Sequence, residues 1–159
     1  MPTGPTIKSK FAKPYVMELL FQALADRTRL RLINLMGEDE VCVCYLVEAL
    51  KLTQPKISRH LAYLRRAGIV RARRDGKWMH YRLAVPPDSR TAAVFAAVRT
   101  QMAADADMQA DRSRLAGLCC SSKVPAPLKR APKPKNMTSA PPARMPKPPK
   151  AAPTQSGRS

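Results

Sequence analysis

The chain has 159 residues, enough for one domain with a modest core. It is strongly basic, because 29 Lys and Arg against 11 Asp and Glu give a formal net charge of +18. No window approaches the roughly 20 apolar residues of a membrane-spanning helix, and the sequence has neither a Gly-rich phosphate loop nor a base–nucleophile constellation. We therefore predict a protein that is not an enzyme, has no membrane partner and binds a polyanion such as nucleic acid.

The cysteines indicate in which compartment the protein functions and which kind of site it has. The N-terminal 20 residues lack the uninterrupted apolar stretch of a signal peptide, so we expect a cytoplasmic protein whose thiols stay reduced. The four cysteines form a one-apart pair, Cys42 and Cys44, and a vicinal pair, Cys119 and Cys120. Such pairs have poor geometry for ordinary disulfides. We therefore interpret them as ligands or sensors.

Four helices are predicted after a flexible arm over residues 1–13. Apolar periodicity places them over residues 14–24, 27–36, 43–50 and 54–67. Asp26 is a suitable N-cap for the second helix and Gly37 a suitable end for it. Thr53 is expected to cap the fourth helix.

Two strands and a last helix follow. Strands are predicted over residues 69–73 and 78–83, joined by a hairpin with the Asp75-Gly76 turn signal. A helix is expected over residues 88–108, with an apolar stripe of Val94, Val98 and Met102. A protein of this size has little core left to cover that stripe. We therefore interpret it, together with the first helix, as a dimer surface.

The composition changes after Cys120. Residues 121–159 hold nine of the Lys and Arg, none of the acidic residues and ten of the 16 prolines. Such a segment cannot bury enough apolar surface to offset its ordering entropy, so disorder is predicted. It either adds non-specific phosphate contacts or is a solvated tail. The expected organisation is thus a flexible arm (1–13), a DNA-binding and dimerisation domain (14–118), and the cysteine pair with a disordered basic tail (119–159).

The third and fourth predicted helices, the tight turn between them and the hairpin are typical of a winged helix-turn-helix. Ile57, Leu61 and Leu64 form the buried face of the fourth helix, which leaves a polar face for the major groove. His60 lies near the edge of the buried face, where packing or a local hydrogen bond is favoured over base contact. The candidate DNA-binding residues are Gln54, Lys56, Ser58, Arg59 and Tyr63 on the helix, and Arg73, Arg74 and Lys77 on the hairpin.

Four segments, ALADRTRLRLINLM, EVCVCYLVEAL, LTQPKISRHLAYLRRAGIV and RRDGKWMHYRL, resemble the ArsR family of winged-helix metalloregulatory repressors, in particular its arsenic-responsive members. The resemblance covers residues 19–83, and a family-like dimerisation helix extends it to residue 108. It implies a mainly α fold with a small β-hairpin, in the order α-α-α-α-β-β-α. It also implies a homodimer that blocks its double-stranded operator DNA until trivalent arsenic or antimony, inorganic or methylated, binds Cys42 and Cys44.

The third thiolate is the open question. In the best-known arsenic sensors a third cysteine follows three residues after the second, and Val47 stands there in this sequence. Cys119 or Cys120, from the same or the partner subunit, is a candidate replacement, and a methylated arsenical would need only two thiolates. Residues i and i+2 of an ideal helix point about 200° apart. Binding to Cys42 and Cys44 is therefore expected to unwind or tilt the start of the third helix.

Two other functions fit the same residues. One is a redox- or persulfide-sensing repressor of the same fold, in which Cys42 or Cys44 bridges to Cys119 or Cys120. The other is a basic architectural DNA-binding protein that has no effector and binds mainly through its tail.

Overall fold

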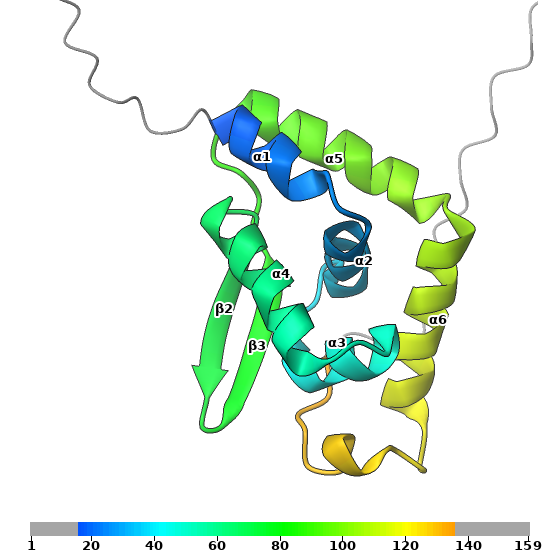
Figure 1. Cartoon of the computed structure of the whole chain (residues 1–159). Helices are drawn as coiled ribbons and strands as arrows, with labels where there is room; N and C mark the ends of the chain where they lie inside the picture. The colour runs from blue at the N-terminus through cyan, green and yellow to red at the C-terminus, as the bar shows by residue number, and fades with distance from the viewer. Residues whose placement is uncertain (1–15, 136–159) are drawn as a thin grey trace, which may run out of the picture.

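The computed structural model describes residues 16–135, and the predicted arm at residues 1–13 lies outside that range (Figure 1). None of the helices described there combines the length and apolar character that a bilayer span requires. The elements, in chain order, are α1 (Val16–Leu24), α2 (Arg27–Met36), β1 (Val41–Cys42), α3 (Val43–Leu50), α4 (Gln54–Arg66), β2 (Val70–Asp75), β3 (Trp78–Leu83), α5 (Ser89–Ala103), α6 (Ala106–Cys120) and a 3-10 turn, η1 (Ala126–Leu128). The fold is mostly helical with a small antiparallel sheet, as predicted.

Helices α2, α3 and α4 enclose the central core. Asp26 caps α2 as expected, because its side chain accepts a hydrogen bond from the backbone amide of Arg29 at 2.9 Å. Thr53 is the N-cap residue of α4 with extended backbone, as predicted, but its side chain makes no capping hydrogen bond. The largest fully buried side chains here are Leu32, Ile33, Leu35, Met36, Tyr45, Leu46, Ile57, Leu61 and Leu64.

The sheet has three strands in the order β1-β3-β2, all antiparallel. Asp75 pairs with Trp78, so Gly76 and Lys77 form a two-residue loop, in which Gly76 adopts the positive φ of 55°. The predicted hairpin is confirmed. The sequence did not indicate β1, since a two-residue strand is too short to have a detectable alternation.

The predicted last helix is two helices. α5 ends at Ala103, and Asp105 caps a new helix by accepting a hydrogen bond from the backbone amide of Met108 at 3.1 Å. α5 packs on α1 and α2, burying Phe95 and Met102, while Val98 stays half-buried. The chain itself therefore covers part of the stripe that we expected to be free for a partner.

α6 turns away from α5 and runs beside α2 and α3 (Figure 1). Asp111 is 2% exposed and pairs with Arg31, whose Nε and Nη2 donate to its two oxygens at 2.6 and 2.7 Å. Arg114 donates to Asp111 at 3.2 Å and to the carbonyl of Ala49 in α3 at 2.8 Å. The buried Asn34 donates to the carbonyl of Met108 at 2.8 Å. α6 is thus tied by side-chain bonds to both helices.

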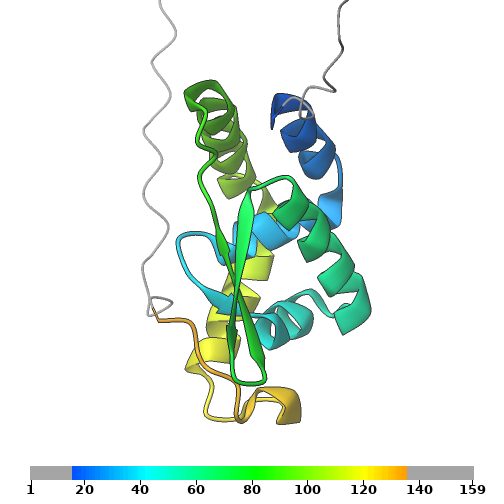
Figure 2. The same ribbon diagram turned by 90° about the vertical axis from the view of Figure 1, so that its left-hand side faces the viewer.

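The chain after α6 folds back beneath α3 (Figures 1 and 2). Leu128 in η1 is 2% exposed and Ala131 is 8% exposed, and both belong to the main core. The prediction of disorder after Cys120 is therefore wrong for residues 121–135, because two apolar side chains reach a surface on α3 that the sequence pattern could not indicate. The rest of the predicted tail, residues 136–159, lies outside the described residues.

Replacing the buried carboxylate of α6 tests this docking. Asp111→Asn should lower the free energy of unfolding by about 2 kcal/mol, because Arg31 and Arg114 lose a charged hydrogen-bond acceptor. Urea denaturation followed by circular dichroism measures the change. Asp107→Asn is the matched control on the same helix, and it should have almost no effect because Asp107 is 79% exposed. Equal effects of the two variants would contradict the docking of α6.

Candidate thiol site and nucleic-acid interface

α4 presents a polar face that no other described element covers. Ile57, Leu61 and Leu64 are fully buried, which turns the opposite side of the helix outwards. Of the candidate residues on that side, Gln54, Lys56 and Arg59 are exposed, and Ser58 and Tyr63 are half-buried. The structure therefore places the predicted helix residues on one accessible surface, as a groove-reading helix requires.

Two aromatic side chains of α4 are occupied by contacts within the chain. The guanidinium of Arg29 lies over the Tyr63 ring, 4.4 Å from its centroid, and holds the ring against α2. His60 Nδ1 lies 3.5 Å from a carboxylate oxygen of Asp26. The interpretation of His60 as a locally bonded residue agrees with this contact, and Tyr63 has less freedom to reach a base than we expected.

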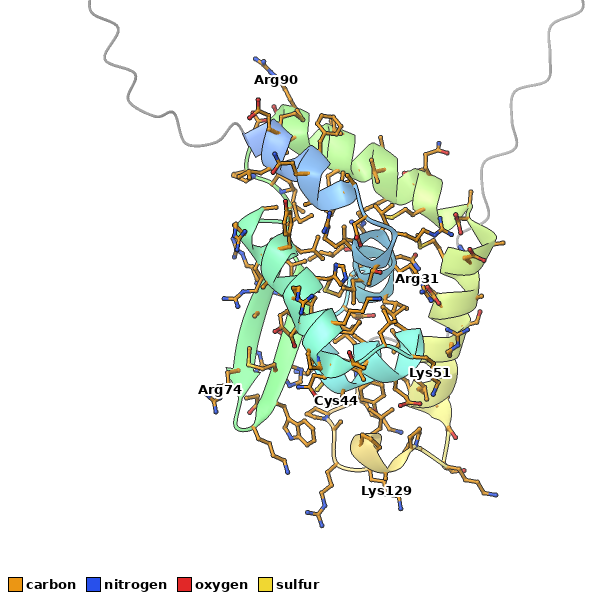
Figure 3. All side chains as sticks on the ribbon, in the orientation of Figure 1. Arg31, Cys44, Lys51, Arg74, Arg90 and Lys129 are labelled. Carbon is orange, nitrogen blue, oxygen red and sulfur yellow. The ribbon has the colours of Figure 1, made fainter. Side chains whose placement is uncertain are left out.

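The hairpin tip carries two of the three predicted basic contacts. Arg74 and Lys77 are both exposed, and Arg74 projects from the edge of the hairpin (Figure 3). Arg74 Nε donates to the carbonyl of Gly76 at 3.0 Å, and Lys77 Nζ lies 5.0 Å from the centroid of the Trp78 ring. Both cations thus remain at the tip, where a wing meets the phosphate backbone.

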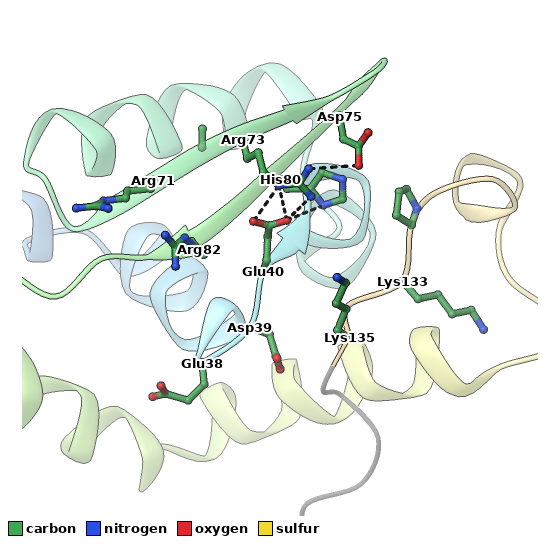
Figure 4. A pocket seen from close by; sticks show the side chains of 12 residues that line it. Glu38, Asp39, Glu40, Arg71, Arg73, Asp75, His80, Arg82, Lys133 and Lys135 are labelled. Carbon is green, nitrogen blue, oxygen red and sulfur yellow. Dashed lines mark hydrogen bonds and ion pairs between the residues drawn. The ribbon is translucent and has the colours of Figure 1, made fainter.

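Arg73 lies on the other face of the hairpin. Its Nε and Nη2 donate to Glu40 Oε1 at 3.0 and 2.6 Å, and its Nη1 lies 3.3 Å from Asp75 Oδ2 (Figure 4). The hydrogen bonds from Arg73 lower the pKa of Glu40. Arg73 is therefore paired with two carboxylates, and its contact with DNA stays a prediction.

A pocket of about 750 Å³ opens beside this ion pair and is lined by Arg71, Arg82, Lys133 and Lys135 as well as acidic residues (Figure 4). His80 lines it and is 5% exposed, with Nδ1 3.8 Å from Glu40 Oε1 and no hydrogen-bond partner for Nε2 within residues 16–135. In the sheet register, His80 is opposite Cys42 on one side and Arg73 on the other. The one-apart cysteine pair is thus joined to the wing by direct strand pairing.

Cys42 and Cys44 already lie together. Cys42 precedes α3 with extended backbone, φ −66° and ψ 140°, and is fully buried, whereas Cys44 is half-buried. Burial raises the pKa of Cys42 to about 11; the adjacent Cys44 backbone opposes this rise and the Cys44 thiol adds to it. The expected unwinding of α3 is therefore not needed to bring the two thiols together, because Cys42 is not part of the helix.

Of the vicinal cysteine pair, Cys119 lies in the interior and Cys120 at the surface. Cys119 is 9% exposed, and burial, followed by the charge of Cys120, raises its pKa to about 11. Cys120 is exposed. Within residues 16–135, no three Cys, His, Asp or Glu side chains are gathered closely enough to hold a metal ion. The structure therefore brings together two of the four predicted ligands and leaves the third position unfilled.

Sequence reasoning missed Tyr45, which directly follows Cys44 on α3. The Tyr45 side chain is fully buried, and its hydroxyl has no hydrogen-bond partner among the described residues. Burial raises the pKa of Tyr45, and so do the nearby charges of Cys119, Cys42 and Cys44, in that order. The only signal in the sequence was a tyrosine directly after the cysteine pair.

The chain is similar in sequence to known bacterial regulators. Residues 26–72 match the family model described as bacterial regulatory protein, arsR family. Over 66 residues the chain is 58% identical to the arsenic resistance transcriptional regulator ArsR1 of Pseudomonas putida, covering 41% of this chain and 52% of that protein. It is 57% identical over 65 residues to the arsenical resistance operon repressor of Escherichia coli, covering 40% and 56%.

The matched region thus spans about half the length of these curated relatives. Among solved structures, HlyU from Vibrio cholerae is similar over 54% of this chain and 90% of its own, with 28% identity and a TM-score of 0.48. The family match covers α2, the cysteine pair, α4 and the start of the hairpin. The uncharacterized HTH-type transcriptional regulator MJ1325 of Methanocaldococcus jannaschii is 46% identical over 63 residues, which cover 71% of its length. Together with the family match, this relative shows that the chain belongs to the arsR family of bacterial regulatory proteins.

Proposed function

We propose that the chain is a DNA-binding transcriptional repressor of an arsenic-resistance operon. It binds double-stranded operator DNA as a homodimer and releases it when trivalent arsenic or antimony, inorganic or methylated, binds cysteine thiolates. The observation that carries this proposal is the thiol pair Cys42–Cys44, which lies at the junction of a wing strand and the helix before α4. The names of the two arsenic-resistance relatives support the choice of ligand.

DNA contact is assigned to α4 and the wing tip. Gln54 and Arg59 have the donors and acceptors to read base edges in the major groove, and Lys56 and Ser58 suit phosphate oxygens. Arg74 and Lys77 reach the backbone or minor groove. The exposure of the four basic members of this set and the burial of the opposite side of α4 support the assignment.

A homodimer is supported by apolar surface on α1 and α5. Phe21 on α1 is 55% exposed. A groove of about 590 Å³ lies between α2, α5 and α6, and its apolar lining includes Leu30, Val98, Met102 and Met108. A two-fold pairing of this face would present two α4 helices to successive major grooves, about 34 Å apart along the duplex.

Soft thiolates select trivalent arsenic and antimony over harder ions. Cys42 and Cys44 would hold the ligand together with Cys119 or Cys120, or alone in the case of a methylated arsenical. A ligand at this position acts on β1, which pairs with the wing, and on α3, which packs against α4. A coupling of about 1–3 kcal/mol would weaken operator binding roughly 5- to 150-fold.

The direct test is fluorescence anisotropy of the reduced protein on DNA from its own promoter region. The complex is titrated with arsenite, methylarsenite, antimonite, zinc and cadmium. Release by the trivalent arsenicals or antimonite alone supports the proposal. Release by oxidant alone would favour a redox sensor, and length-dependent binding without operator preference would favour an architectural protein.

The cysteine pair generates a prediction for ligand release. Cys44→Ser should leave operator affinity unchanged and abolish release by arsenite, because Cys44 lies half-buried at the edge of the core and serine is nearly the same size but is not a soft ligand. The same anisotropy titration measures both quantities. Ser122→Ala, an exposed site beyond α6, is the control and should behave as the wild type. Loss of operator binding by Cys44→Ser would make Cys44 a structural residue.

The recognition helix generates a prediction for operator binding. Arg59→Ala should weaken operator binding by about 1–3 kcal/mol, as expected for loss of a bidentate base contact, and should weaken binding to a scrambled duplex far less. Competition anisotropy with both duplexes measures the ratio. Arg90→Ala serves as control, because Arg90 is also exposed but lies at the far end of the molecule from Arg74 (Figure 3). If Arg59→Ala weakens both duplexes equally, Arg59 contacts only phosphate.

A further inference from the structure

α6 has one buried stripe, and it ends in a cysteine. Met108, Asp111, Leu115 and Cys119 follow one another at three- and four-residue spacings, and all four are buried against the rest of the chain. Cys120 is rotated by about 100° from Cys119 on the helix and is exposed. Only one thiol of the vicinal pair therefore faces the interior.

The interior side of Cys119 is the region of Tyr45. The Tyr45 hydroxyl is fully buried and lacks a hydrogen-bond partner within residues 16–135. A buried hydroxyl without a partner costs roughly 1–3 kcal/mol, and such groups in folded proteins call for an explanation. Tyr45 and Cys44 lie on α3, which packs against α6, the helix that carries Cys119.

We propose that Cys119 of the same chain, and not Cys120, supplies the third thiolate of the arsenic or antimony site that Cys42 and Cys44 begin, with the Tyr45 hydroxyl as a hydrogen-bond donor to that site. This inference rests on the proposed function and identifies the ligand that the sequence leaves open. It explains both the inward position of Cys119 and the unpartnered hydroxyl of Tyr45.

The bonds that hold α6 make the third ligand an intrachain one. Arg31 and Arg114 both bind Asp111, which lies about two turns before Cys119. Arg114 also binds the Ala49 carbonyl at the end of α3. These bonds fix the register of α6 along α2 and α3 of its own chain. A partner subunit would have to displace α6 to place its own cysteine beside Tyr45.

The three sulfurs are not yet gathered, because no three-ligand group exists within residues 16–135. Sulfurs bound to one ion must approach within roughly 4 Å, given metal–sulfur bonds near 2.3 Å. Ligand binding must therefore draw the last turn of α6 towards the start of α3. Cys119 lies in that last turn, beyond the Asp111 bonds.

This closure transmits force to both DNA-contacting elements. The start of α3 is continuous with β1, whose Cys42 pairs with His80 of the wing, and α3 packs against α4.

Arsenite needs no redox partner for the reaction. Each thiol proton combines with one arsenic-bound hydroxide to leave as water while one arsenic–sulfur bond forms, so that three thiols release three waters and arsenic remains trivalent.

The matched variants Cys119→Ser and Cys120→Ser, made in the full chain, test the proposal. Arsenic K-edge X-ray absorption should give three sulfur neighbours for the wild type and for Cys120→Ser, and two for Cys119→Ser. In the operator titration, Cys119→Ser should need about tenfold or more arsenite for release yet keep its response to methylarsenite, which requires only two thiolates. Two sulfurs in the wild type, or a loss confined to Cys120→Ser, would overturn the proposal.

Mixed dimers test whether the site is intrachain. A subunit carrying Cys42→Ser and Cys44→Ser is combined with a Cys119→Ser subunit. An intrachain site predicts no three-sulfur arsenic in the mixed dimer, whereas a site shared between subunits restores one. A wild type that arsenite neither binds nor releases from DNA would refute the proposed function itself, an outcome distinct from a change in the identity of the third sulfur.

Tyr45→Phe separates a role at the site from a role in packing. Removal of the unpartnered hydroxyl should raise the melting temperature of the free protein, while the arsenite affinity should fall severalfold with the sulfur count still three. These opposite signs arise because the hydroxyl has a partner only when the ligand is bound. An arsenite affinity equal to that of the wild type would remove Tyr45 from the proposal.

Discussion

The buried carboxylate of Asp111 is the interaction on which the C-terminal half of the structure depends. It receives Arg31 from α2 and Arg114 from α6, and Arg114 extends the network to the carbonyl of Ala49 in α3. A buried ion pair adds little net stability, because the attraction is offset by desolvation of both charges. What it provides is position, since only one register of α6 satisfies all these donors. That register determines which cysteine of the terminal pair faces the interior.

Two short routes connect the thiol pair to the wing and α4, the elements proposed to contact DNA. One is the β1–β3 pairing, in which Cys42 is opposite His80 and His80 is opposite Arg73, so that a displacement of β1 reaches the wing within one strand spacing. The other is α3, which packs against the recognition helix. Neither route requires the helix itself to unwind, because Cys42 lies outside α3. Arg73 and Glu40 form part of the first route, because their ion pair joins the wing to the residue before β1.

The segment after α6 packs on the core and borders the pocket beside the Glu40–Arg73 pair. Leu128 and Ala131 anchor it on the core, although the segment is rich in Pro and Lys. Its exposed cations, Lys133 and Lys135, line the pocket beside the Glu40–Arg73 pair. Composition described this segment poorly because two well-placed apolar side chains are enough to hold a short strap, and an average over 39 residues conceals them.

The sequence by itself determined the helix-turn-helix, the hairpin and the polar face of α4, because periodicity, the Asp26 cap and the Gly76 turn are local signals. It also identified the Cys42–Cys44 pair. Only the tertiary structure decided the break at Asp105, the docking of α6, the neutralisation of Arg73 by Glu40, and the separation of a buried Cys119 from an exposed Cys120. Each of these depends on partners distant in sequence, such as Arg31 and Asp111. A pattern within a single segment has no information on which side chains the fold will bring to it.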